Sequence, residues 1–144
     1  MADIFELAGR FRSDGETIAA TVGQTQARWQ VMSAASGKPL TVPQIARRLG
    51  VTRQNVQRIA DVLVSENWAT FESNPDHRGS PHLTLNTRGK TALAELHLAA
   101  HASHAKLARR LAGVDIGAIH RGLLRLIEVM NDRDVTFPKR GADS

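Results

Sequence analysis

The segment from Thr41 to Ile59 constrains the fold more than any other feature, because it predicts two short helices that cross at a steep angle. Such a crossing needs a small side chain where the helices touch, and Ala46 supplies it. The turn four residues later needs a left-handed backbone, which Gly50 adopts at little steric cost. Thr52 can cap the second helix by accepting a hydrogen bond from a backbone N–H group. The spacing therefore predicts a helix-turn-helix.

Apolar residues of this segment predict its buried side. Pro43 falls near the start of the first helix, where its missing N–H group costs no hydrogen bond. The other apolar positions recur at the spacing of one helix face. We expect these side chains to fill the space beneath the two helices: Ile45, Leu49, Val51, Val56, Ile59 and Leu63.

Polar residues at the start of the second helix predict what the motif binds. Arg, Gln and Asn side chains make paired hydrogen bonds to base edges, and recognition helices place their first turns in the major groove. The alternative is an ordinary helical hairpin with a glycine turn, but nothing in such a hairpin gathers these residues at one helix end. We expect Lys38 and Arg47 to contact phosphates, and the helix to read DNA through Thr52, Arg53, Gln54, Asn55, Gln57 and Arg58.

A β-hairpin is predicted directly after this motif. Residues 68–73 and 82–85 alternate as strands do, and residues 74–81 form a loop rich in turn residues. Arg78 lies at the tip, and a narrow minor groove attracts a guanidinium group. By itself, Arg78 would be a solvated loop charge; next to a helix-turn-helix we expect it to contact DNA. Residues 37–86 are thus predicted to form a winged helix-turn-helix domain.

Two helices are predicted before this domain. Apolar residues recur at helical spacing over residues 4–22, and we expect the helix to loosen at residues 13–15, Ser-Asp-Gly. Thr25 is a suitable N-cap for the second helix. This second helix is predicted to turn three side chains inward: Trp29, Met32 and Ala35.

Two further helices are predicted after the domain, with apolar stripes from Leu93 to Leu111 and from Ile116 to Met130. Their spacing is that of helices packing on helices. We expect residues 1–36 and 87–134 to form a helical dimerisation region shared between two chains, although a bundle within one monomer fits the same spacing. Residues 135–144 are predicted to be a flexible tail.

The charge is concentrated in the middle of the chain. The net charge is +5, and residues 37–90 contribute +4 of it. A basic surface favours a polyanionic partner. The excess therefore lies where the DNA-binding motif is predicted.

Several features are absent from the sequence. It has no cysteine, which excludes disulfides, thiolate metal sites and cysteine-based redox sensing. It has no glycine-rich phosphate loop, HExxH or GxSxG motif, so we expect neither an enzyme nor a cofactor. No apolar run approaches the roughly 18 residues of a membrane span, and the N-terminus does not read as a signal peptide. We expect a soluble, cytoplasmic protein.

The chain resembles the MarR family of regulators over roughly residues 4–133. The resemblance rests on the helix-turn-helix, on Gly23-Gln24-Thr25 with Trp29, on Asp76-x-Arg78, and on the run from Leu83 to Gly89. It implies an intertwined winged-helix dimer that usually represses transcription and often releases DNA when a small aromatic or phenolic ligand binds. It also implies that Arg78 contacts the minor groove and that Asp76 holds Arg78 in place. The chain departs from the family at Gln24, where leucine is common, and in a less basic wing.

A ligand pocket is predicted where the second helix, the long helix and the motif meet. Trp29 and Met32 offer apolar surface there, and Arg28 or His97 could contact an acidic or phenolic group. The alternative is that Trp29 and Met32 are plain core residues with no cavity beside them.

Three histidines lie along one side of the long helix. His97, His101 and His104 are spaced at i, i+4 and i+7, and an i, i+4 pair can bind zinc. No cysteine lies near them, and the closest carboxylate is Glu95, so we expect histidines at a packing edge and no metal site.

We predict a mainly α (α+β) winged helix-turn-helix protein that regulates transcription, as a homodimeric repressor on a pseudo-palindromic operator. Winged helices also serve as architectural DNA binders without sequence preference, or as protein-interaction modules without ligand control. The sequence leaves these alternatives open.

Overall fold

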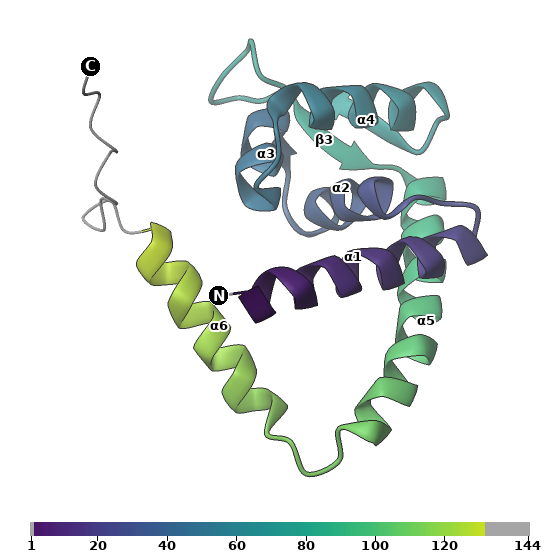
Figure 1. The fold of residues 1–144 in the computed structure, drawn as a ribbon. Helices are drawn as coiled ribbons and strands as arrows, with labels where there is room; N and C mark the ends of the chain where they lie inside the picture. Colours follow the sequence, from purple (N-terminus) through teal and green to yellow (C-terminus); the bar gives the residue numbers. More distant parts are fainter. Residues whose placement is uncertain (1, 132–144) are drawn as a thin grey trace, which may run out of the picture. The chain divides into compact units, whose positions relative to one another are not determined.

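The computed structural model describes residues 2–131, so the predicted tail at residues 135–144 lies outside the described part. The chain divides into two units between Leu107 and Ala108. The helices and strands are α1 (Ala2–Thr21), α2 (Gln26–Gly37), β1 (Leu40–Thr41), α3 (Val42–Leu49), α4 (Arg53–Ser65), β2 (Ala69–Glu72), β3 (His82–Leu85), α5 (Thr87–Arg110) and α6 (Ile116–Asn131) (Figure 1).

Helices α2, α3 and α4 pack with the sheet around one apolar core. α2 lies between α1 on one side and α4 with β3 on the other (Figure 1). Each of these core elements contributes fully buried side chains, and burying one large apolar side chain stabilises the fold by about 1.5–3 kcal/mol. The largest of them are Val31, Met32, Ile45, Val56, Leu63 and Leu83, joined by Leu96 of α5.

The sheet is antiparallel with strand order β1-β3-β2. Leu83 of β3 lies opposite Leu40 of β1 and opposite Phe71 of β2. The predicted hairpin is confirmed. Strand β1 was not predicted, because two residues are too few to show the alternation by which a strand is recognised.

The helix-turn-helix is confirmed in its local details. Thr41 and Gln44 form a capping box: the Thr41 hydroxyl accepts from the Gln44 N–H (3.4 Å), and the Gln44 side-chain oxygen accepts from the Thr41 N–H (2.8 Å). Ala46 is buried at the helix crossing. Gly50 ends α3 with φ of 66°, the left-handed conformation that the turn was predicted to need.

The predicted burial of Val51 is wrong. Its side chain is 39% exposed, and Leu49 is only half-buried. Val51 directly follows the left-handed Gly50, and its N–H donates to the Ala46 carbonyl (3.1 Å) in closing α3, which leaves the side chain on the outer side of the turn. Val42, at the start of α3, is buried in the core instead.

Helix α1 runs unbroken through residues 13–15, where a loosening was predicted. Gly15 is buried, and a Cβ atom there would lie 2.7 Å from Nε2 of Gln26. Glu16 accepts a hydrogen bond from the Gln26 N–H through Oε2 (2.8 Å). Gly15 therefore marks a close approach to the start of α2, and a glycine in a helix can serve packing without ending the helix.

The predicted N-cap of α2 is confirmed. The Thr25 hydroxyl accepts from the Arg28 N–H (3.3 Å). Met32 and Ala35 are buried as predicted, and Trp29 is half-buried against the core.

Apolar side chains are exposed on the outer helices of the single chain. On α1, Ile18 and Ala19 are buried, but Ile4, Leu7 and Phe11 are exposed. On α5, Leu93, Leu96 and Ala100 are buried, and Leu107 is exposed. The apolar face of α6 is exposed along its length, at Ile116, Ile119, Leu123, Leu126, Ile127 and Met130. Within residues 2–131, no helix has the length and apolarity that a membrane crossing requires.

Candidate nucleic-acid interface

Helix α4 presents a polar N-terminal turn held by a side-chain cap. The Thr52 hydroxyl accepts from the Asn55 N–H (3.2 Å), as predicted. Val56, Ile59 and Leu63 face the core, so the helix cannot rotate without exposing them. The polar residues of the first turns are therefore fixed on the outer side of the motif.

Two of these polar side chains have no partner within the described residues. Neither Arg53 nor Gln54 takes part in a hydrogen bond or ion pair there, and both are exposed. By contrast, Gln57 donates to Asp61 through Nε2 (2.7 Å), and Arg58 makes a long contact with Asn55 Oδ1 (3.4 Å). Arg53 and Gln54 can thus bind a new partner without breaking an existing contact.

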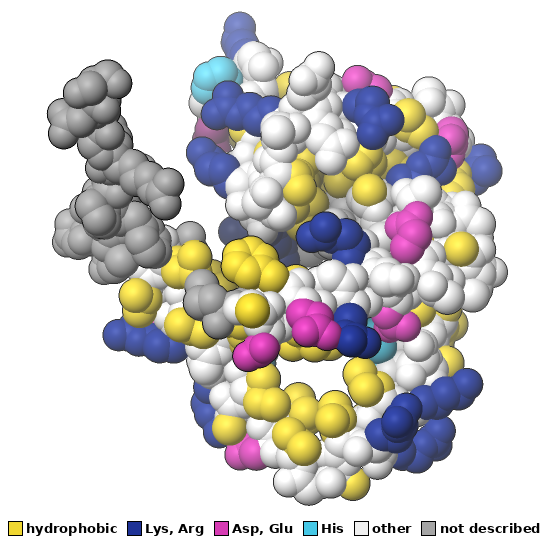
Figure 2. All heavy atoms as spheres, in the orientation of Figure 1, with side chains coloured by type: hydrophobic (Ala, Val, Ile, Leu, Met, Phe, Trp, Pro, Cys, Tyr) yellow, Lys and Arg dark blue, Asp and Glu magenta, His cyan; other side chains and the backbone are white. Residues whose placement is uncertain are grey.

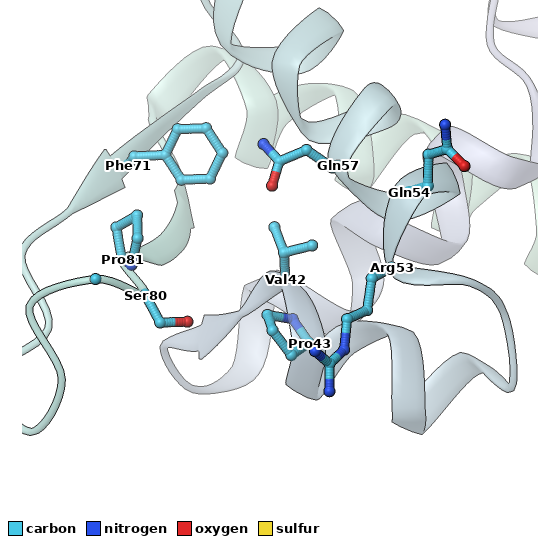
Figure 3. A pocket seen from close by; sticks show the side chains of 9 residues that line it. Val42, Pro43, Arg53, Gln54, Gln57, Phe71, Ser80 and Pro81 are labelled. Atoms are coloured by element: carbon cyan, nitrogen blue, oxygen red, sulfur yellow. The ribbon is translucent and has the colours of Figure 1, made fainter.

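A hollow of about 420 Å³ separates the start of α4 from the wing. Figure 3 shows Arg53 and Gln57 on one side of it and Phe71 with Ser80 and Pro81 on the other, above Val42 and Pro43 of α3. The open space thus lies between α4 and the wing, the two elements that were predicted to contact DNA. Helix α4 and the wing therefore line one hollow together.

The wing loop is organised by Asn74, which is buried although it lies in a loop. Its Nδ2 donates to the Ser80 carbonyl (2.9 Å), and its Oδ1 accepts from the Asp76 N–H (3.0 Å). Asn74 was not singled out in the sequence. An Asn before Pro in a turn-rich loop is the signal that could have identified it, because Asn side chains bond to the backbone two residues on.

Asp76 and Arg78 are both exposed in this loop. None of the ion pairs formed among the described residues joins them, so the bracing of Arg78 by Asp76 that the resemblance implies is not formed in this structure. The position of Arg78 therefore depends on the wing loop, whose shape is held by the hydrogen bonds of Asn74.

The basic residues predicted to contact phosphate are exposed. Lys38 is the C-cap of α2, and Arg47 lies in the last turn of α3. Arg48, which was not predicted to contact DNA, follows Arg47 and is also exposed. Figure 2 shows Lys and Arg side chains spread over the upper part of the view, where α3, α4 and the wing lie in Figure 1. A surface of this kind attracts the DNA backbone independently of its sequence.

The four residues predicted to bind a ligand do not line one common hollow. Trp29 and His97 are neighbours, with ring centroids 6.4 Å apart. Arg28 is bound by both carboxylate oxygens of Glu66, at 3.0 and 2.7 Å, and Met32 is fully buried. Trp29 instead lines a hollow of about 270 Å³ between α2 and α3, with Gln26, Gln30, Ser33, Ala34, Arg48 and Leu49.

The three histidines of α5 do not converge. His97 faces Trp29, and His104 Nε2 lies 3.7 Å from Asp14 Oδ2 of α1. In the part of the chain that the structure describes, no three His, Asp or Glu side chains are grouped as a metal site requires.

The three-stranded sheet, the capped helix pair and the hairpin define a winged helix-turn-helix protein, as predicted. A model of the MarR family matches residues 23–78. The uncharacterized protein Rv2011c of Mycobacterium tuberculosis is 47% identical over 127 residues, which is 88% of this chain and 89% of the relative. The chain belongs to the MarR family of transcription regulators.

Solved structures share this fold at low sequence identity. The transcriptional repressor CouR bound to a 23-mer DNA duplex has a TM-score of 0.70 and 22% identity, and the match covers 89% of each chain. CouR from Rhodococcus jostii RHA1 bound to p-coumaroyl-CoA has a TM-score of 0.75 and 13% identity, and the match covers 94% of this chain and 92% of that one. Both similarities concern the fold.

Proposed function

We propose that this protein is a sequence-specific repressor that binds a pseudo-palindromic operator as a homodimer. The observation that carries the proposal is the pair Arg53 and Gln54, exposed and unengaged within the described residues, at the capped end of α4. Arg pairs with guanine and Gln with adenine in the major groove, each by two hydrogen bonds. The hollow between α4 and the wing supports a duplex contact that spans both elements. A relative of the same fold, CouR, is a repressor bound to DNA.

The homodimer is supported by the exposed apolar faces of α1 and α6. On a single chain, α1 exposes Phe5 and Phe11, and α6 exposes Ile119, Leu123 and Leu126. An exposed apolar face on a helix is typical of an association site. We propose residues 1–36 and 87–134 as the dimerisation region and residues 37–86 as the DNA-binding domain. A two-fold dimer places its two recognition helices on half-sites about one helical turn, roughly 10 bp, apart.

The test is selection of a binding site from random DNA with the purified protein, followed by affinity measurements on that site and on a scrambled one. A sequence-specific regulator binds the selected site at least about 10³-fold more tightly. An architectural binder would hold both sites equally, and a protein-interaction module would show no salt-dependent binding to either. Either of these results would exclude the proposal.

We also propose that a small aromatic or phenolic acid releases the DNA. The hollow beside Trp29 supports this, because the indole offers an aromatic wall and Arg48 of the same hollow offers a cation. Since this hollow lies between α2 and α3, a ligand there can favour one position of the helix-turn-helix over another. CouR, which has this fold, binds p-coumaroyl-CoA.

A further inference from the structure

Asp61 lies on the outer face of α4, among the residues predicted to read bases. Arg53, Gln57 and Asp61 follow one another at intervals of four residues, so their side chains lie along one stripe of the helix, and all three are exposed. A carboxylate near DNA phosphates opposes binding, because both groups are negatively charged. An acidic residue in this stripe therefore needs a role other than contact with the DNA backbone.

The side chain of Gln57 holds the Asp61 carboxylate. Gln57 Nε2 donates to Asp61 Oδ1 (2.7 Å), and none of the ion pairs among the described residues includes Asp61. An ionised carboxylate only accepts hydrogen bonds, so the Gln57 amide must turn its NH₂ group toward Asp61 and its oxygen, Oε1, elsewhere. Figure 3 shows this oxygen turned into the hollow between α4 and the wing, which Gln57 lines.

Gln54 carries the same side chain three residues earlier, but nothing holds its amide. It is exposed and takes no part in a side-chain hydrogen bond among the described residues. The Gln54 amide can therefore turn either its oxygen or its NH₂ group toward a base. Gln57 cannot turn over without bringing its oxygen against the Asp61 carboxylate, and two acceptors repel each other. The two glutamines thus differ in what they can offer to a groove.

The order of the two amide atoms matters in the major groove of DNA. Adenine N6 and cytosine N4 are amino groups, which donate hydrogen bonds, whereas guanine O6 and thymine O4 are acceptors. An oxygen held toward the groove accepts from the first pair of bases and is repelled by the second pair. A fixed amide can therefore distinguish adenine and cytosine from guanine and thymine.

We propose that Asp61 is a positioning residue, which holds Gln57 Oε1 toward the DNA so that Gln57 selects adenine or cytosine over guanine or thymine. Asp61 itself does not contact the base. The inference rests on the proposed DNA binding and adds the class of base that one residue reads. The alternative is a surface hydrogen bond without effect on base choice, because a Gln–Asp pair at this spacing also stabilises isolated helices.

The hydrogen bond is tested first in the free, full-length protein by ¹⁵N-resolved NMR of the side-chain amides. Gln54→Ala and Gln57→Ala each delete one pair of NH₂ signals and thereby assign both pairs. One NH₂ proton of Gln57 should resonate downfield of its position in Asp61→Ala, because a hydrogen bond to a carboxylate deshields it. The Gln54 signals should be the same in both proteins. A Gln57 pair that does not move would overturn the positioning by Asp61 without any measurement on DNA.

Base choice is then measured by selecting sites from random DNA with the wild type and its variants. The position that Gln57→Ala relaxes is the position that Gln57 reads. The wild type should prefer adenine or cytosine there by about tenfold, which is within the usual cost of one mismatched base pair. Asp61→Asn should reduce this preference to about twofold, because the asparagine amide can also donate to Gln57 and lets the glutamine turn over.

Removal of a negative charge near DNA has its own effect and needs a control. Asp61→Asn should strengthen binding to all sequences, because repulsion from the phosphates is lost. Glu72→Gln removes one negative charge from an exposed residue of β2 in the same domain and should leave base choice unchanged. In a Gln57→Ala background, Asp61→Asn should also leave base choice unchanged, since the residue that it positions is absent.

Three results of the selection would overturn the inference while the proposed function stands. They are a selected site in which Gln57→Ala relaxes no position; a preference for guanine or thymine at the position that it relaxes; and an equal preference there in the wild type and Asp61→Asn. A wild-type protein that selects no sequence would overturn the proposed function and this inference together. Circular dichroism of each variant shows that a changed preference does not reflect a loss of fold.

Discussion

Gly89, in the first turn of α5, lies against the carbonyl oxygen of Trp68 so closely that no side chain fits between them. Two hydrogen bonds of Asn86 lie beside this close contact between Gly89 and Trp68. The Asn86 N–H donates to the same carbonyl, and Asn86 Oδ1 accepts from the Gly89 N–H (3.0 Å), which caps α5. Gly89 thereby fixes the long helix to the end of the winged-helix domain.

Gly89→Ala is therefore expected to destabilise the protein by about 1–3 kcal/mol or more, since overpacking here meets backbone and not a flexible side chain. Gly9→Ala is the control, because a Cβ atom at Gly9 meets nothing within 4 Å, and alanine should stabilise α1 by about 0.5–1 kcal/mol. Urea denaturation measures both. Equal effects of the two substitutions would show that the close approach is not maintained in solution.

Base reading and phosphate binding should separate by mutation. Arg53→Ala or Gln54→Ala should each cost about 1–3 kcal/mol on the selected operator and relax sequence choice at particular positions. Lys38→Ala or Arg47→Ala should weaken all sequences alike and reduce the salt dependence. Fluorescence anisotropy on the operator and on scrambled DNA at several salt concentrations makes the comparison. If both groups of variants lose the same affinity on both DNAs, α4 is not the recognition helix.

The sequence predicted those features of the fold that depend only on residues close to each other in the chain. The caps at Thr25 and Thr52 and the left-handed Gly50 depend only on neighbouring residues, and all three are confirmed. Gly15 was misread because the side chain that needs its space belongs to α2. Likewise, nothing near Arg28 in the sequence indicates that Glu66, 38 residues away, neutralises it. Contacts with residues distant in the sequence therefore determine the close packing at Gly15 and the ion pair of Arg28.

Asn74→Ala should loosen the wing. The substitution leaves the Ser80 carbonyl and the Asp76 N–H without their partner, and the loop would no longer hold Arg78 in one place. We expect faster amide hydrogen exchange over residues 76–80 and weaker binding to operators with A·T-rich flanks, where a narrow minor groove attracts arginine. Ser73→Ala, at an exposed neighbouring position, is the control. An unchanged exchange rate in Asn74→Ala would show that the wing is ordered by other contacts.

A charge on the apolar face of α6 should prevent dimerisation. Leu123→Arg places a guanidinium in the surface that we propose to be buried between two chains, where an unpaired charge is costly. Sedimentation should then show a monomer at micromolar concentration, with a loss of operator binding. Arg121→Ala, on the opposite side of α6 by helical spacing, should leave the dimer intact. A wild-type protein that sediments as a monomer would contradict the prediction directly.

The proposed aromatic effector should act through Trp29. In the Trp68→Phe variant the only indole is that of Trp29, so its emission reports the hollow between α2 and α3. A titration with hydroxycinnamic and salicylic acids should change this emission and weaken operator binding at the same ligand concentrations, because linkage makes the two effects reciprocal. Arg48→Ala should raise the ligand concentration required, whereas Arg110→Ala, at an exposed position outside the hollow, should not.

A ligand that changes Trp29 emission while operator affinity stays constant would bind the hollow without being an effector. If none of these acids changes the emission at all, release of DNA by an aromatic acid at Trp29 is excluded.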